Sequence, residues 1–145
     1  MNNIEEGLIK LRTVVITLDS TTSELYEPMS NIIHNLKTMP DTITGANELK
    51  IYADEVISIV DSIQAKVNET WGGIESMFKR FEGKSQVEAD VLAEQFSSEL
   101  AEITTNTAMI GVSVDLLQEK SMALVPKAIK LLTCVLNNLK HDNDD

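Results

Sequence analysis

The chain has few of the residues from which reactive centres are built. Its 145 residues include one cysteine, Cys134, and two histidines, His34 and His141. A single thiol cannot form an intramolecular disulfide. Neither histidine has a carboxylate three residues before it, which is the spacing of di-iron helical bundles. Because glycine-rich phosphate loops and nucleophile elbows are also absent, we expect no catalytic residue, no metal, no cofactor and no enzymatic activity.

Residues that form loops and aromatic cores are scarce as well. The chain contains 3 prolines and 6 glycines, and aromatic residues make up 4% of it, although 43% of its residues are hydrophobic. So few turn-forming residues do not suit a loop-rich fold. A core without aromatics must be aliphatic, which favours helix-on-helix packing. The sequence therefore predicts an all-α protein, large enough at this length to bury a core.

Basic residues are outnumbered by acidic ones, 12 to 23, so that the formal net charge is −11. Nucleic-acid binding depends on Lys and Arg that neutralise phosphates, so we expect no direct nucleic-acid binding. The N-terminal residues lack a basic start and an apolar run, which are the marks of a signal peptide. No unbroken run of about 20 apolar residues occurs, so we expect no membrane span. A cytoplasmic location is expected, and secretion by a leaderless route is the alternative.

Apolar residues recur at steps of three and four along three long segments, which is the heptad pattern of packed helices. The segments cover residues 4–36, 49–81 and 92–117. Pro28 interrupts the first segment without breaking its register, which predicts a kink or two abutting helices. Residues 38–45 read as a loop, and Asn47 is the expected N-cap of the second helix.

The second helix should end near Gly83, a residue that suits a left-handed C-cap. Ser85 with Glu88 fits a capping box at the start of the third helix. A short fourth helix should begin near Pro126, because proline favours the first helical turn.

These elements predict an elongated antiparallel helical bundle, in which three long heptad-patterned helices are joined by a short C-terminal helix. Short connections place consecutive helices antiparallel. Residues 1–140 should form a single bundle domain. The tail 141–145, with three acids at a helix C-terminus, should be frayed because the helix dipole disfavours negative charge there.

Trp71-Gly72-Gly73, followed by Phe78 and Phe81, resembles the Trp-x-Gly turn of WXG-type proteins. The resemblance covers about residues 47–120 and implies a helical hairpin exported by a type VII secretion system, often as a dimer. The apolar register, however, continues through the motif from Val67 to Met77. It predicts a continuous helix from about Asn47 to Phe81, in which replacement of both glycines with alanine should raise the melting temperature.

The segment 122–132 is basic and amphipathic, unlike the rest of the chain. Such a helix can lie on a membrane surface or dock in a groove of a partner. Alternatively, it closes the bundle as the fourth helix while its lysines extend into solvent. If the chain touches a membrane at all, we expect the contact through the helix at 122–140.

Between Ser85 and Glu119 the chain has no basic residue. The candidate partner-binding residues in this stretch are Glu88, Asp90, Glu94, Glu99 and Glu102. A single-sign surface of this length lacks stabilising ion pairs; it either serves solubility or docks a basic partner, and it could even imitate nucleic acid.

The sequence thus predicts a non-catalytic protein–protein interaction module, an inhibitor, immunity protein or adaptor that binds a protein with a basic surface. The alternative is a structural or secreted helical component that assembles into homo-oligomers through its apolar seams.

Overall fold

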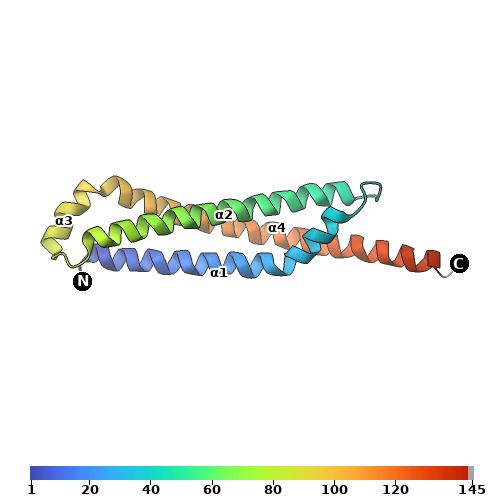
Figure 1. Cartoon of the computed structure of the whole chain (residues 1–145), viewed down its shortest axis with the longest axis horizontal. Helices are drawn as coiled ribbons and strands as arrows, with labels where there is room; N and C mark the ends of the chain where they lie inside the picture. The colour runs from blue at the N-terminus through green and yellow to red at the C-terminus, as the bar shows by residue number, and fades with distance from the viewer. Residues whose placement is uncertain (144–145) are drawn as a thin grey trace. The chain divides into compact units, whose positions relative to one another are not determined.

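The computed structural model describes the backbone of residues 1–143 and the side chains through residue 139, and throughout this range the protein is all-α, as predicted. It contains α1 (Asn3–Thr38), α2 (Ala46–Phe81), α3 (Gln86–Gln95) and α4 (Ser97–Asn143) (Figure 1). The helices α1 and α2 have 36 residues each, and α4 has 47. No strand occurs among the described residues. The predicted frayed tail at 141–145 falls on the last helical turn and on residues outside the description.

Contacts divide the chain into two compact units. Unit 1 combines residues 1–22 with 61–114, and unit 2 combines residues 23–60 with those from 115 onward. The three long helices each contribute to both units, whereas α3 belongs to unit 1 alone. The candidate residues all lie in unit 1.

The buried core is aliphatic and follows the predicted heptads. On α2 the positions predicted to face inward are all buried except the first, Leu49, which is half-buried; they are Ala53, Val56, Val60, Ile63, Val67, Thr70, Ile74, Met77 and Phe81. Removing such side chains from water contributes about 1.5–3 kcal/mol for each large aliphatic residue. Because helices in proteins owe most of their stability to such packing rather than to propensity, this burial stabilises the 36 residues of α2 as one helix.

Three threonines stand at core positions of the heptads: Thr22, Thr70 and Thr107, at most 6% exposed. Each hydroxyl donates to the backbone oxygen four residues earlier in its own helix, at 2.7–2.8 Å. The polar atoms are therefore satisfied without a partner helix, and the methyl groups pack as small aliphatic side chains.

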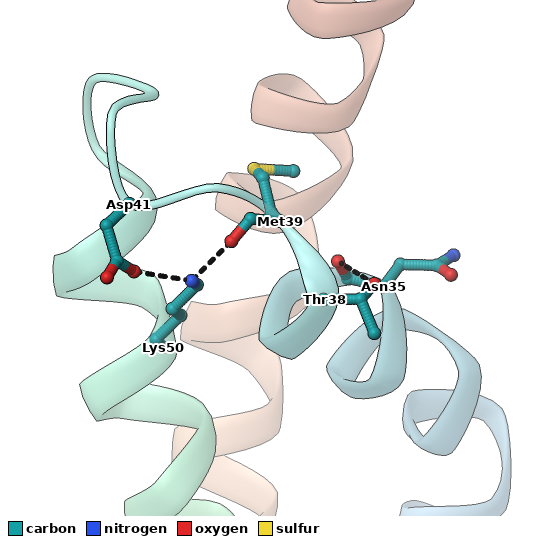
Figure 2. A network of polar contacts seen from close by, with 5 residues as sticks. All are labelled: Asn35, Thr38, Met39, Asp41 and Lys50. Atoms are coloured by element: carbon teal, nitrogen blue, oxygen red, sulfur yellow. Dashed lines mark hydrogen bonds and ion pairs between the residues drawn. The ribbon is translucent and has the colours of Figure 1, made fainter.

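The loop between α1 and α2 is held by a lysine (Figure 2). Lys50 on α2 donates from Nζ to the backbone oxygen of Met39 and to Asp41, whose carboxylate lies 2.7 Å away. Gly45, with φ of +87°, turns the chain directly into α2, which begins at Ala46. The prediction that Asn47 caps this helix was wrong, because the helix begins at Ala46 and Asn47 lies within its first turn.

Two predicted signals between α2 and α3 are confirmed. Gly83, with φ of +73°, has the left-handed conformation expected after a helix. The Ser85 hydroxyl accepts a hydrogen bond from the amide of Glu88 at 3.2 Å and caps α3.

The predicted third and fourth helices were placed wrongly, because the break lies at Phe96 and not near Pro126. The ring of Phe96 packs edge-on against Phe81, with centroids 6.5 Å apart. The guanidinium of Arg80 lies 4.7 Å from the same ring centroid. Hydrogen bonds continue from Phe96 N to Leu92 O and from Leu100 N to Phe96 O. The chain therefore bends at Phe96, where these two hydrogen bonds connect the residue to both helices, and α3 meets α4 at an angle (Figure 1).

Pro126 lies inside α4, and Pro28 lies inside α1. Both side chains are exposed, so that each ring faces solvent and each helix loses one backbone hydrogen bond. Near Pro126, Leu124 and Ala128 are fully buried, and this packing carries α4 across the proline as one helix.

Asn2 joins the start of α1 to the end of α2. Its side-chain oxygen accepts a hydrogen bond from the amide of Glu5 at 2.8 Å, and the Glu5 carboxylate accepts one from the amide of Asn2 at 3.2 Å. The side-chain nitrogen of Asn2 donates to the backbone oxygens of Phe81 and Lys84 at 3.0 and 3.1 Å. Asn2 is therefore both a helix cap and a clamp, and it is 3% exposed.

The segment Trp71-Gly72-Gly73 is continuous helix within α2, so that the hairpin turn implied by the WXG resemblance is not formed there. The two glycines differ in their surroundings. A methyl group on Gly72 would meet nothing within 4 Å, whereas one on Gly73 would lie 3.2 Å from Ile103 Cγ1 on α4. Gly73 therefore allows α4 to approach α2 closely, whereas no neighbouring segment comes close to Gly72.

The contrast predicts different melting temperatures for the two alanine variants. Gly72→Ala should stabilise the protein by about 1 kcal/mol, because alanine costs less backbone entropy in a helix. Gly73→Ala gains the same entropy but pushes on Ile103, so we expect its melting temperature to fall below that of Gly72→Ala. Thermal unfolding followed by circular dichroism measures both. If both variants raised the melting temperature equally, the close contact between Gly73 and Ile103 would be contradicted. The expectation from the sequence, that alanine is favourable at both glycines, would then hold.

Replacement of Asn2 tests the clamp. Asn2→Ala removes the cap and one donor to each of two backbone oxygens, although the oxygen of Phe81 keeps the amide of Lys84 as a second donor. The loss should cost about 2 kcal/mol in the free energy of unfolding. Urea unfolding measures it. Asn3→Ala is the matched control, because Asn3 contributes only its backbone amide to Gln86; an equal loss in both variants would refute the clamp.

Candidate partner-binding surface

The five predicted carboxylates are all exposed, but they do not share one helix. Glu88, Asp90 and Glu94 lie on α3, whereas Glu99 and Glu102 lie on α4, beyond the bend at Phe96. The predicted third helix, which was to begin at Ser85, is therefore divided within this stretch. We call these five residues the acidic set.

The three carboxylates on α3 are carried by a helix with little buried surface. Ala89 is the one fully buried residue of α3, and Val87 and Val91 are 75% and 65% exposed. The helix is tied down at its start, where Gln86 Nε2 donates to Asp90 at 2.8 Å and Gln86 Oε1 accepts from the amide of Asn3 at 2.9 Å. Asp90 thereby helps to orient the residue that joins α3 to α1.

The two carboxylates on α4 stand at a hollow between α4 and α2, both within unit 1. The hollow has a volume of about 270 Å³ and is lined by Glu69, Thr70, Gly73, Ser76, Met77, Glu99, Glu102, Ile103 and Asn106. Its base is apolar, because Met77 and Ile103 are each 5% exposed. Its rim carries three carboxylates, so a cation is the ligand that its charge favours.

Among the described residues, no lysine or arginine forms an ion pair with the acidic set. The ion pairs among the described residues join Lys37 to Asp54, Lys50 to Asp41, Lys66 to Glu69 and Lys120 to Glu55. The hydrogen bond from Lys120 to Glu55, at 3.0 Å, raises the pKa of that lysine above its ordinary value. Lys120, the first basic residue after the acidic stretch, thus pairs within unit 2, and the five carboxylates have no ion pair among the described residues.

Residue types associated with metal binding or nucleophilic chemistry are dispersed. His34 and Cys134 are exposed on α1 and α4. Within residues 1–139, no three His, Cys, Asp or Glu side chains are grouped closely enough to hold a metal ion. Cys134 lines two hollows beside the loop of unit 2, of about 460 and 430 Å³, together with apolar residues and lysines of α4.

The C-terminal part of α4 presents apolar side chains on two sides. Leu124 and Ala128 face the core of unit 2, whereas Met122, Ile129 and Leu136, at steps of seven, are 71%, 51% and 65% exposed. By length and composition α4 is apolar enough to cross a membrane, with a mean hydropathy of 1.3 over 18 residues, of which 11% are buried. The expectation of no membrane span rested on the lack of an unbroken apolar run. It stays a prediction, because a helix can be apolar on average while polar residues interrupt its apolar ones.

Three residues that matter here were not singled out from the sequence. Asn2 and Glu5 match the spacing of a capping box, which is the signal that could have found the clamp. Asn106 follows Ile103 by three residues, which is one of the steps of the heptad pattern. The pattern therefore places this polar residue on the buried face, and that was the signal available in the sequence. The contact of Gly73 with Ile103 has no local signal, because it depends on how closely two distant segments pack.

Comparison of the chain with known protein families, with characterised proteins and with solved structures finds no match. The residues of the chain therefore carry the functional argument alone.

Proposed function

We propose that the chain is a non-catalytic protein–protein interaction module that acts as an inhibitor, immunity protein or adaptor toward a partner with a basic surface. In this proposal it is an elongated antiparallel bundle that works in the cytoplasm. The observation that carries the proposal is that five exposed carboxylates on α3 and α4 have no basic partner among the described residues.

Electrostatics supports this proposal. Like charges on a folded surface repel one another and cost stability. A basic partner relieves that cost, and the summed field of a chain with a net charge of −11 steers such a partner toward it. Exposed ion pairs add little affinity, so the field should act mainly on the association rate.

The association rate of such a complex should fall as salt rises, because screening shortens the field to about 8 Å at physiological ionic strength. The partner is first recovered by affinity purification from the native cell, and stopped-flow mixing then gives the rates. Glu99→Lys with Glu102→Lys should slow association at low salt by about tenfold or more and flatten its salt dependence. Circular dichroism should be unchanged, because both residues are exposed.

The matched control reverses two exposed acids with the same spacing on α1, Glu24→Lys with Glu27→Lys. It makes the same change in net charge away from the acidic set. If the control slows association as much as the test variant, only the net charge acts. If neither variant alters the rate, the acidic set is a device for solubility and the proposal is refuted.

Self-assembly is a second candidate function, favoured by the exposed apolar residues of α4. Met122, Ile129 and Leu136 occupy one heptad position, and the half-buried Val125 and Leu132 occupy the next apolar one. No acidic residue lies between Glu119 and Asp142. Two copies that met along this stretch would not bring carboxylates together, as they would over the acidic set.

Leu136→Glu tests this second candidate. Leu136 is 65% exposed, so a carboxylate there should leave the fold intact but dissociate an assembly that buries it, which light scattering after size exclusion would detect as a fall in mass. Ile51→Glu is the matched control, because Ile51 is a comparable 63% exposed on α2. A monomeric wild-type chain at all concentrations would exclude this candidate.

A further inference from the structure

Asn106 is a buried polar residue without a partner in unit 1. It is 8% exposed, and its carboxamide makes no hydrogen bond to any described residue, although buried side-chain amides usually make several. Yet no buried side-chain nitrogen or oxygen of the described residues is both sealed from solvent and unpaired. Because Asn106 lines the hollow between α2 and α4, its carboxamide must open into that hollow.

The other residues of the hollow restrict what can satisfy this carboxamide. Glu99 and Glu102 lie on the rim without an ion pair among the described residues, whereas the Glu69 carboxylate pairs with Lys66 Nζ at 3.5 Å. These carboxylates disfavour an anion. A metal ion would require three closely grouped ligands, which the described residues do not supply. A purely apolar ligand would leave Asn106 unsatisfied.

The size and the base of the hollow narrow the choice further. Its volume of about 270 Å³ lies below the range of about 300–1,000 Å³ typical of small-molecule pockets, so it suits one side chain better than a larger ligand. Met77 and Ile103, the two buried apolar residues of the lining, form the base, and Gly73 lines the hollow beside them. The lack of a side chain at Gly73 lets Ile103 approach α2 closely, so the base of the hollow is closed by apolar atoms.

We propose that this hollow binds the side chain of one arginine from the basic partner. The aliphatic stem packs on Met77 and Ile103, since long basic side chains cover apolar surface in this way. The guanidinium reaches Glu99 and Glu102 at the rim, and one of its five N–H groups donates to the Asn106 side-chain oxygen. Lysine fits less well, because its ammonium is a compact charge that lacks the planar fork matched to carboxylates.

This inference rests on the proposed function and deepens it. The acidic set supplies long-range attraction, whereas the hollow supplies a short-range contact that recognises one residue. The two parts are separable by experiment, because the hollow can be probed without the partner.

The probe is a blocked pentapeptide, Gly-Ser-Arg-Ser-Gly, titrated into the isotope-labelled full chain and followed by NMR. We expect the side-chain amide signals of Asn106 to shift as the arginine peptide is added. Peptides with lysine or with uncharged citrulline in place of arginine should bind at least about tenfold more weakly. Glu99→Gln with Glu102→Gln should weaken binding of the arginine peptide by a similar factor.

The matched control is Glu88→Gln with Glu94→Gln, which removes the same charge from α3 and should leave binding unchanged. Asn106→Leu should weaken binding of the arginine peptide, because it removes the acceptor of one guanidinium N–H; if that variant fails to fold, Asn106→Ser removes the carboxamide with less apolar bulk. Unshifted Asn106 signals, equal binding of the citrulline peptide, or equal effects of the two double variants would overturn the proposal.

The partner itself separates failure of the hollow from failure of the proposed function. If partner binding keeps its salt dependence but Asn106→Leu leaves its affinity unchanged, the hollow is not used and the acidic docking surface stands. If the arginine peptide binds as expected but reversal at Glu99 and Glu102 leaves partner binding unaffected, the proposed function fails while the hollow remains a binding site.

Discussion

Burial of aliphatic side chains along α2 is the constraint on which the other features depend. Because the core has almost no aromatic residues, it is filled by Val, Ile, Leu, Met and Ala at regular steps, and neighbouring helices must approach closely to cover them. Positions without bulk therefore gain importance: Ala53 and Ala89 are fully buried, and Gly73 meets Ile103. The polar residues of the core bond within their own helix, as the threonines do, join two segments, as Asn2 does, or open to a hollow, as Asn106 does.

The sequence predicts the parts of the fold that depend on local pattern. The heptads of α2, the left-handed glycine at 83 and the cap at Ser85 all follow from neighbours within a few residues, and all are confirmed. Errors arose where tertiary packing overrides a local signal. Pro126 is typical of a helix start, but the burial of Leu124 and Ala128 carries the helix across it. At Phe96, where α3 ends, the ring contacts Phe81 and Arg80, which belong to another helix.

For the candidate site, the sequence identifies which residues are charged but not how they are arranged. The acidic set is exposed, as expected from composition, yet its division between α3 and α4 depends on the bend at Phe96. The hollow at Glu99 and Glu102 required α2 and α4 to be placed side by side, which no local pattern specifies. Asn106 illustrates the difference: its inward position follows from the heptad, but its lack of a partner appears only once its neighbours are known.

The bend at Phe96 also divides the acidic set by local stability. The helix α3 buries little more than Ala89, and segments with few buried contacts open at a lower free energy than the rest of a domain. The amides of α3 should therefore exchange with solvent faster than those at the start of α4, where Ile103 and Thr107 are buried. A partner that contacts Glu88 or Glu94 must restrain a mobile helix and lose affinity to that ordering, whereas one that contacts Glu99 and Glu102 meets a surface already fixed.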